Sequence, residues 1–113
     1  MKTRSAKNKG KRLQNTVRDV LLETFDTLEP DDIKSAIMGD SGEDIQLSPA
    51  ARKLIPYSIE CKNQESVSIW KAYEQAEENS GDYEPIVVLK RNKTKPLVLI
   101  DADYFVKLHD KFD

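Results

Sequence analysis

The sequence predicts an α/β fold with its elements in the order αβββαββα. Apolar residues recur at helical spacing over the first quarter of the chain, which indicates an amphipathic helix. Short runs rich in Val, Ile and Leu, bounded by Gly, Pro and Asp, follow later and are typical of strands. At 113 residues, with 38% hydrophobic and 34% charged residues, the chain is expected to form one globular domain.

The first helix is predicted over residues 11–28 and should end at the stretch EPD. Three strands are expected after it. They cover residues 33–38, 43–47 and 57–62, with a turn at 39–42 and a short helical or looped excursion at 48–56 that Ser48 and Pro49 begin.

A second helix is predicted over residues 66–79, with Gly81 near its C-terminal cap. Ile69, Trp70, Tyr73 and Ala76 are expected to form its buried stripe, so Trp70 and Tyr73 are interpreted as core residues and not as base-stacking residues. The chain should then form a hairpin and a last helix. The two strands cover residues 85–89 and 96–100, joined by KRNKTK, and the helix covers residues 101–112.

The distribution of charge is uneven, although the net charge is only -2. Residues 1–10 are basic and are expected to form a flexible tail. No apolar run approaches the roughly 20 residues that span a bilayer, and the basic start lacks the apolar segment of a signal peptide. A single cysteine, Cys61, excludes an internal disulfide, and no Cys/His cluster has zinc spacing. A cytoplasmic location is expected, in the host cell if a phage encodes the chain.

The third predicted strand ends in the stretch SIECK. Alternate residues of a strand share a face, so Glu60 and Lys62 should point one way while Ile59 and Cys61 point into the core. The plain interpretation is a solvent-facing ion pair, worth about 0.5 kcal/mol.

The position of Asp44 favours a different interpretation. It begins the preceding predicted strand, so strand pairing is expected to bring it beside Glu60. Adjacent carboxylates repel each other unless a divalent cation lies between them, and hard oxygen ligands suit Mg²⁺ or Mn²⁺. The backbone carbonyl of Cys61 is expected to add a ligand, and Lys62 to orient or deprotonate a bound water. The pattern therefore predicts a phosphodiester hydrolase.

The spaced Asp44, the IECK strand and the helix after it resemble the PD-(D/E)xK nuclease superfamily. More closely, NKGKRLQNTVRDVLLE, MGDSGEDIQLSP and SIECKNQE are similar to its archaeal and phage Holliday-junction-resolvase-like branch, over residues 9 to about 108. The resemblance implies a restriction-endonuclease-like αβββαβ core, a central mixed sheet flanked by helices, in one nuclease domain over residues 11–113. It also implies a Mg²⁺-dependent endonuclease of DNA recombination, active on branched DNA as a homodimer.

The resemblance assigns the metal-binding aspartate to Asp44, the acidic strand residue to Glu60 and the catalytic lysine to Lys62. The glutamine often found on the following helix falls on Gln75, for which a plain surface role is an equal alternative.

The chain departs from the resolvase pattern on its first helix, where Gln14 stands in place of a glutamate. Its neutral amide would hold a metal more weakly, so the number of metals stays open. Glu23 and Glu43 are candidates to replace the missing carboxylate.

Several cationic and amide residues are expected to contact the DNA backbone without reading bases. They are Lys9, Lys11 and Arg12, which precede or open the first helix, Arg18 within it, Arg52 and Lys53 in the excursion, and Asn63 and Gln64 after the third strand. Three alternatives remain. These are a less specific phage-type nuclease for genome processing or DNA degradation, a catalytically silent DNA-binding relative, and a small interaction protein with a chance ExK.

Overall fold

The longest element is α1 (Lys2–Thr24), seen in the computed structural model, which describes residues 2–37 and 42–112. Residues 2–10, expected to belong to a flexible tail, form the first turns of α1, and the helix ends at Thr24, so the predicted helix boundaries at 11 and 28 are both wrong. Lys, Arg and Ala are good helix formers, and Gly10 alone in this segment carries a helix penalty of about 1 kcal/mol. A turn follows α1, with the N–H of Leu28 bonded to the carbonyl of Phe25 at 3.0 Å.

Within the described residues, five strands form two small sheets and not the single central mixed sheet predicted. In the first sheet β1 (Ile33–Ser35), which follows the 3-10 turn η1 (Pro30–Asp32), pairs antiparallel with β2 (Ile45–Leu47). In the second, β3 (Tyr57–Asn63) pairs parallel with β4 (Glu84–Lys90), and β4 pairs antiparallel with β5 (Leu97–Leu99). The predicted turn at 39–42 lies largely outside the described residues.

The sheet is divided because β2 is short. Ser48 ends it by capping α2 (Pro49–Leu54): its hydroxyl accepts a hydrogen bond from the N–H of Ala51 at 3.1 Å, and Pro49 takes the first helical position. The chain therefore leaves the strand direction before β2 can run beside β3. A backbone hydrogen bond of 3.0 Å, from the N–H of Asp44 to the carbonyl of Ile59, still joins the two sheets.

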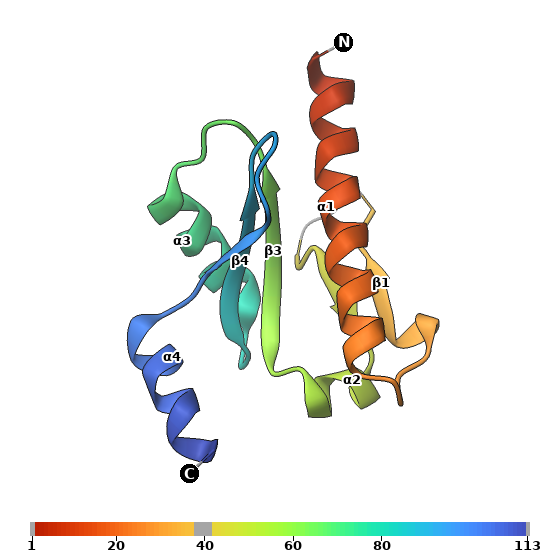
Figure 1. Ribbon diagram of the computed structural model, residues 1–113, viewed down its shortest axis with the longest axis vertical. Coiled ribbons are helices and arrows are strands. Elements are labelled where there is room, and N and C mark those ends of the chain that lie inside the picture. Colours follow the sequence, from red (N-terminus) through yellow and green to blue (C-terminus); the bar gives the residue numbers. More distant parts are fainter. Residues whose placement is uncertain (1, 38–41, 113) are drawn as a thin grey trace.

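Strand β3 lies between two helices, with α1 on one face and α3 (Ile69–Ser80) on the other (Figure 1). Ile59 and Cys61 pack with Leu13 in the core cluster beneath α1. On the opposite face, Val87 packs with the small residues of α3. Both faces of β3 are covered along most of its length, so even the polar Ser58 and Glu60 are buried.

The buried stripe predicted for the second helix is partly wrong. Trp70 is 79% exposed and Ile69 is 45% exposed, whereas Ala72, Ala76 and Ser80 face the sheet. Small residues every four positions allow α3 to approach the strands closely, and this leaves the bulky Trp70 on the outer side.

The chain ends in α4 (Ala102–Leu108) and the 3-10 turn η2 (His109–Phe112). Asp101 caps α4 by accepting a hydrogen bond from the N–H of Tyr104 at 2.9 Å. Figure 1 shows α4 at the opposite end of the molecule from the first turns of α1. Among the described helices, none is long and apolar enough to cross a membrane.

Candidate functional site

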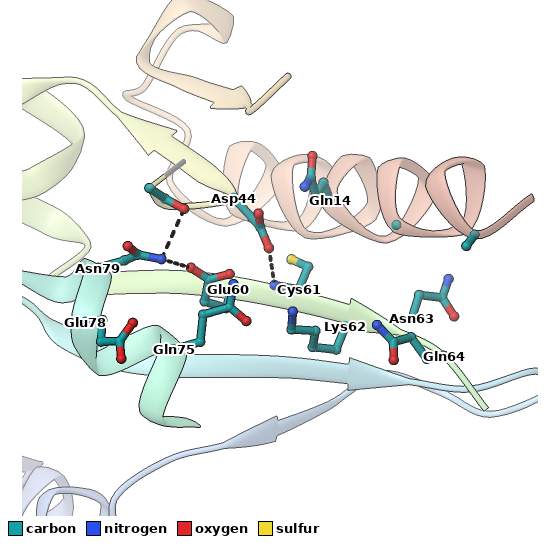
Figure 2. A pocket seen from close by; sticks show the side chains of 13 residues that line it. Gln14, Asp44, Glu60, Cys61, Lys62, Asn63, Gln64, Gln75, Glu78 and Asn79 are labelled. Atoms are coloured by element: carbon teal, nitrogen blue, oxygen red, sulfur yellow. Dashed lines mark hydrogen bonds between the residues drawn. The ribbon is translucent and has the colours of Figure 1, made fainter. Parts of the chain in front are cut away.

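The five residues predicted to be catalytic line one pocket of about 330 Å³. We call it the carboxylate pocket. Gln14 comes from α1, Asp44 from the segment before β2, Glu60 and Lys62 from β3, and Gln75 from α3 (Figure 2). The predicted juxtaposition is therefore present, although the residues lie as much as 61 positions apart in the sequence.

Asp44 is fixed to β3 through both its main chain and its side chain. Its carboxylate Oδ2 accepts a hydrogen bond of 2.7 Å from the backbone N–H of Cys61, in addition to the 3.0 Å bond from its own N–H to the carbonyl of Ile59. The N–H and C=O of one strand residue point to the same edge. The carbonyl of Cys61, the predicted third ligand, therefore faces the edge where Asp44 lies.

Glu60 is a buried carboxylate, only 2% exposed, and not half of a solvent-facing pair. Its Oε1 accepts a hydrogen bond of 2.8 Å from the side-chain amide of Asn79. Burial, together with the charge and hydrogen bond of Asp44, raises the pKa of Glu60 to about 7, although Asn79 and Lys62 act to lower it. Glu60 therefore keeps its proton up to near neutral pH, because it is buried and the charge of Asp44 opposes its ionisation.

The donors in the pocket fit a hard divalent cation. The described residues contain no cluster of three or more His, Cys, Asp or Glu side chains that could hold a metal. The pocket instead offers the carboxylates of Asp44 and Glu60 at its centre and that of Glu78 on α3, with neutral groups from the Gln14 amide and the Cys61 backbone. Mg²⁺ is held in proteins by one or two carboxylates and keeps several waters, so this donor set suits it.

Lys62 and Gln75 complete the centre of the pocket. Lys62 is half-buried, and its charge lowers the pKa of Glu60, so it lies close enough to act on the carboxylate pair. Of the described residues that line the pocket, it is the only cation. Figure 2 shows Gln75 pointing from α3 toward Glu60, which favours the site interpretation over a plain surface role.

Sequence reasoning missed Asn79, Glu78 and two small residues of α1. Asn79 holds Glu60 and also donates to the carbonyl of Gly42 at 3.4 Å, while Glu78 lines the pocket beside it. Helical spacing could have found both, because they lie three and four positions after Gln75. Gly10 and Ala6, one turn and two turns before Gln14, leave the α1 side of the pocket open.

The two proposed substitutes for the first-helix glutamate do not line the pocket. Glu43 pairs with Arg52 at 2.5 Å, and Glu23 lies exposed near the C-terminal end of α1. Gln14, which is 2% exposed, is therefore the residue through which α1 contributes a polar side chain.

The structure separates the predicted DNA contacts into two groups. Asn63 and Gln64 line the carboxylate pocket, and Lys9 and Arg12 lie in an adjacent hollow. The side chain of Asn63 donates to the carbonyl of Lys9 at 2.9 Å. This hydrogen bond joins the end of β3 to α1.

Other predicted contacts have intramolecular partners instead. Arg18 donates to the carbonyls of Ile33 at 2.7 Å and Pro30 at 3.2 Å, and so fastens α1 to the first sheet. Arg52 donates to the carbonyl of Tyr57 at 3.0 Å as well as pairing with Glu43. The amine of Lys11 reaches the carbonyl of Ala36 at 3.2 Å, whereas Lys53 is exposed away from the pocket.

Comparison with known proteins found no matching family model, curated protein or solved structure. The functional conclusion therefore depends on the geometry of the carboxylate pocket.

Proposed function

We propose that this chain is a Mg²⁺-dependent DNA endonuclease that hydrolyses phosphodiester bonds, prefers branched DNA and acts as a homodimer. Mn²⁺ is expected to substitute for Mg²⁺. The observation that supports the proposal best is the buried Glu60 beside Asp44 and Lys62, with each carboxylate oriented by its own hydrogen-bond donor.

The order of elements supports a restriction-endonuclease-like core. Helix α1, strands β1, β2 and β3, helix α3 and strand β4 follow one another as αβββαβ. The hydrogen bond between Asp44 and Ile59 lies where β2 would meet β3 in a continuous sheet. We therefore interpret the two sheets as one such core, interrupted beyond Asp44.

We expect the carboxylates of Asp44 and Glu60 to hold the metal ion. A bound Mg²⁺ would relieve their repulsion, activate a water and stabilise negative charge on the phosphate oxygens. The side chain of Asn79 donates to one oxygen of Glu60, and the N–H of Cys61 donates to one oxygen of Asp44. Both carboxylates are thereby held in fixed orientations before substrate arrives, which is the condition for preorganised catalysis.

Lys62 is the cation that lines the carboxylate pocket among the described residues. We expect it to hold the attacking water or take its proton, and to offset the charge that builds on the phosphate. Gln75 adds an amide from α3 that can orient a water or a phosphate oxygen.

The proposed dimer follows from the symmetry of a four-way junction, in which two strands are cut. The edge strand β5 exposes Leu97 and Val98, at 58% and 55%. If two copies pair antiparallel about Val98, Lys95 of each copy lies opposite Asp101 of the other, and opposite charges in that position are favourable. This edge is therefore the surface we assign to the second copy.

Cleavage of labelled DNA tests the proposal. A four-way junction, a linear duplex and a single strand are incubated with Mg²⁺, Mn²⁺ or EDTA, using the wild type and Glu60→Gln. We expect metal-dependent cutting of the junction by the wild type, and none by the variant. Equal cutting of all three substrates would leave a less specific nuclease. DNA binding without cutting under either metal would identify a silent relative, and would reject the enzyme.

A further inference from the structure

A second hollow, of about 250 Å³, lies between α1 and the hairpin that joins β4 to β5. Its charged lining consists of cations only among the described residues. They are Lys9 and Arg12 from α1 and Lys90 and Lys93 from the hairpin. We call this hollow the basic cleft. Figure 1 shows the hairpin and the N-terminal half of α1 toward the same end of the molecule.

The basic cleft adjoins the carboxylate pocket. Asn63 lines both hollows, and its side chain donates to the carbonyl of Lys9. Lys62, which lines the pocket, and Asn63, which lines both hollows, are consecutive residues of β3. A polymer bound in the pocket would therefore reach the cleft with its next unit. The neutral donors of the cleft, Thr16, Asn63 and Asn92, suit phosphate oxygens as well.

The hairpin side of the cleft is held in place by hydrogen bonds. The N–H of Gln64 donates to the carbonyl of Lys90 at 2.9 Å, and the N–H of Asn92 donates to Oε2 of Glu65 at 2.6 Å. The N–H of Arg91 donates to the hydroxyl of Thr94 at 3.2 Å. The cations at the tip are therefore presented from a fixed turn.

Lys93 has an unfavourable backbone conformation for a lysine. Its φ angle is +65°, a left-handed conformation that costs a residue with a side chain about 1 kcal/mol and that Gly or Asn adopts more readily. A turn selected for stability alone would favour one of those residues. Lys93 thus places a positive charge at the hairpin tip, at a position where Gly or Asn would be less strained.

We propose that the basic cleft binds the DNA backbone next to the bond that is cut, so that one duplex arm runs across the cleft with its phosphates against α1 and the hairpin. The proposal rests on the nuclease function only for the cutting step. Binding itself depends mainly on Lys9, Arg12 and Lys93, because the amine of Lys90 donates to the carbonyl of Arg91 at 3.0 Å. The contacts go to phosphates and not to bases.

The test measures binding in EDTA, where no cutting occurs. Fluorescence anisotropy with a labelled duplex follows the wild type, Lys93→Asn, Arg12→Gln and the double variant from 50 to about 200 mM salt. We expect the double variant to bind at least tenfold more weakly at low salt. Each lost phosphate contact should lower the slope of log K against log[salt] by about 0.9. Asparagine tolerates the backbone at 93, so thermal unfolding of Lys93→Asn should occur at or above the wild-type temperature.

The matched control is Lys107→Gln, because Lys107 is a surface lysine of α4 paired with Asp103 at 3.0 Å. It should bind as the wild type does. Wild-type affinity and slope in the double variant would reject the basic cleft, even if metal-dependent cutting is present. Weakened binding in the double variant, with no cutting by the wild type, would support the cleft and reject the nuclease. Absence of DNA binding by the wild type at 50 mM salt would reject the cleft as well.

Discussion

Two acidic hollows lie among the described residues, the carboxylate pocket and one other, and they differ in how their carboxylates are held. The second, of about 500 Å³, lies between α3 and α4, and we call it the tyrosine pocket. It is lined by Tyr73 and Tyr104 together with Glu77, Glu84, Asp101 and Asp103. It has more acidic side chains than the carboxylate pocket, yet all of them are exposed or half-buried.

Burial and orientation distinguish the carboxylate pocket. Glu60 is buried and held by Asn79, and Asp44 is held by a main-chain N–H, whereas Glu84 is half-buried and its pKa is raised by burial and by Asp101 and Glu77. Exposed carboxylates can turn away from one another in water, so their repulsion is screened. The comparison shows that the number of acidic side chains does not identify a metal site. Carboxylates that are held in place and shielded from water gain the most free energy from a bound cation, because they cannot relieve their repulsion in any other way.

The largest effect is expected on the rate of DNA cleavage, when one carboxylate in each pocket is replaced by a carboxamide. Asp44→Asn should lower metal-dependent DNA cleavage by about 1,000-fold or more, because it removes a charged oxygen from the proposed metal ligands. Glu84→Gln, in the tyrosine pocket, should cleave at the wild-type rate. Single-turnover cleavage of the same labelled junction measures both. Equal losses in the two variants would remove the distinction between the pockets.

A smaller effect is expected from the residue that orients Glu60. Asn79→Ala should weaken Mg²⁺-dependent activity by about 10-fold to 100-fold, the usual cost of losing a hydrogen-bond partner of a metal ligand. The loss should appear mainly as a higher Mg²⁺ concentration for half-maximal cleavage. Glu74→Gln, an exposed substitution on the same helix, is the control and should leave the Mg²⁺ dependence unchanged.

Glu60→Gln should stabilise the metal-free protein at alkaline pH. The pKa of Glu60 is raised from 4.5 to about 7 in the folded chain, so folding costs free energy once this group ionises. The penalty is absent below about pH 4.5, grows as the pH rises, and is complete above about pH 7.

At pH 8 in EDTA, Glu60→Gln should therefore raise the free energy of unfolding by about 1 to 3 kcal/mol, and at pH 4 it should change little. Urea unfolding followed by circular dichroism measures this. Glu84→Gln should show a gain of the same sign but smaller size, because Glu84 is more exposed. A pH-independent effect of Glu60→Gln would contradict the raised pKa of the buried Glu60.

The smallest effect is expected on the outer side of α3. Trp70→Ala should change the free energy of unfolding by less than about 0.5 kcal/mol, since Trp70 is 79% exposed. A core tryptophan would cost about 3 to 5 kcal/mol when replaced by alanine. Urea unfolding again decides between the two, and cleavage by this variant should equal that of the wild type.

The local sequence pattern was sufficient to predict which residues of β3 and its neighbouring segment come together in the carboxylate pocket. Strand alternation placed Glu60 and Lys62 on one face, and the position of Asp44 at the start of a strand predicted its approach to Glu60. The α/β class and the order of elements were also predicted. These features depend on residues close in sequence or on one strand pairing, which short-range periodicity can indicate.

Features that depend on tertiary packing could not be predicted in the same way. The pairing of Arg52 with Glu43, and of Arg18 with backbone carbonyls, requires knowledge of which loops meet. The outward position of Trp70 follows from how closely α3 approaches the sheet, which the apolar pattern of the helix does not specify. The division of the sheet results from the early end of β2 at Ser48.

The donor that holds Asp44 belongs to the main chain of Cys61, and this affects how the site can change in evolution. Any residue except proline at position 61 keeps that N–H. The side chain at 61 lies under α1 and can drift with the packing of that helix, while the orientation of Asp44 is inherited unchanged. Part of this site is therefore encoded by the path of the backbone and leaves no trace in residue identity, so diverging sequences can retain it after their recognisable motifs are lost.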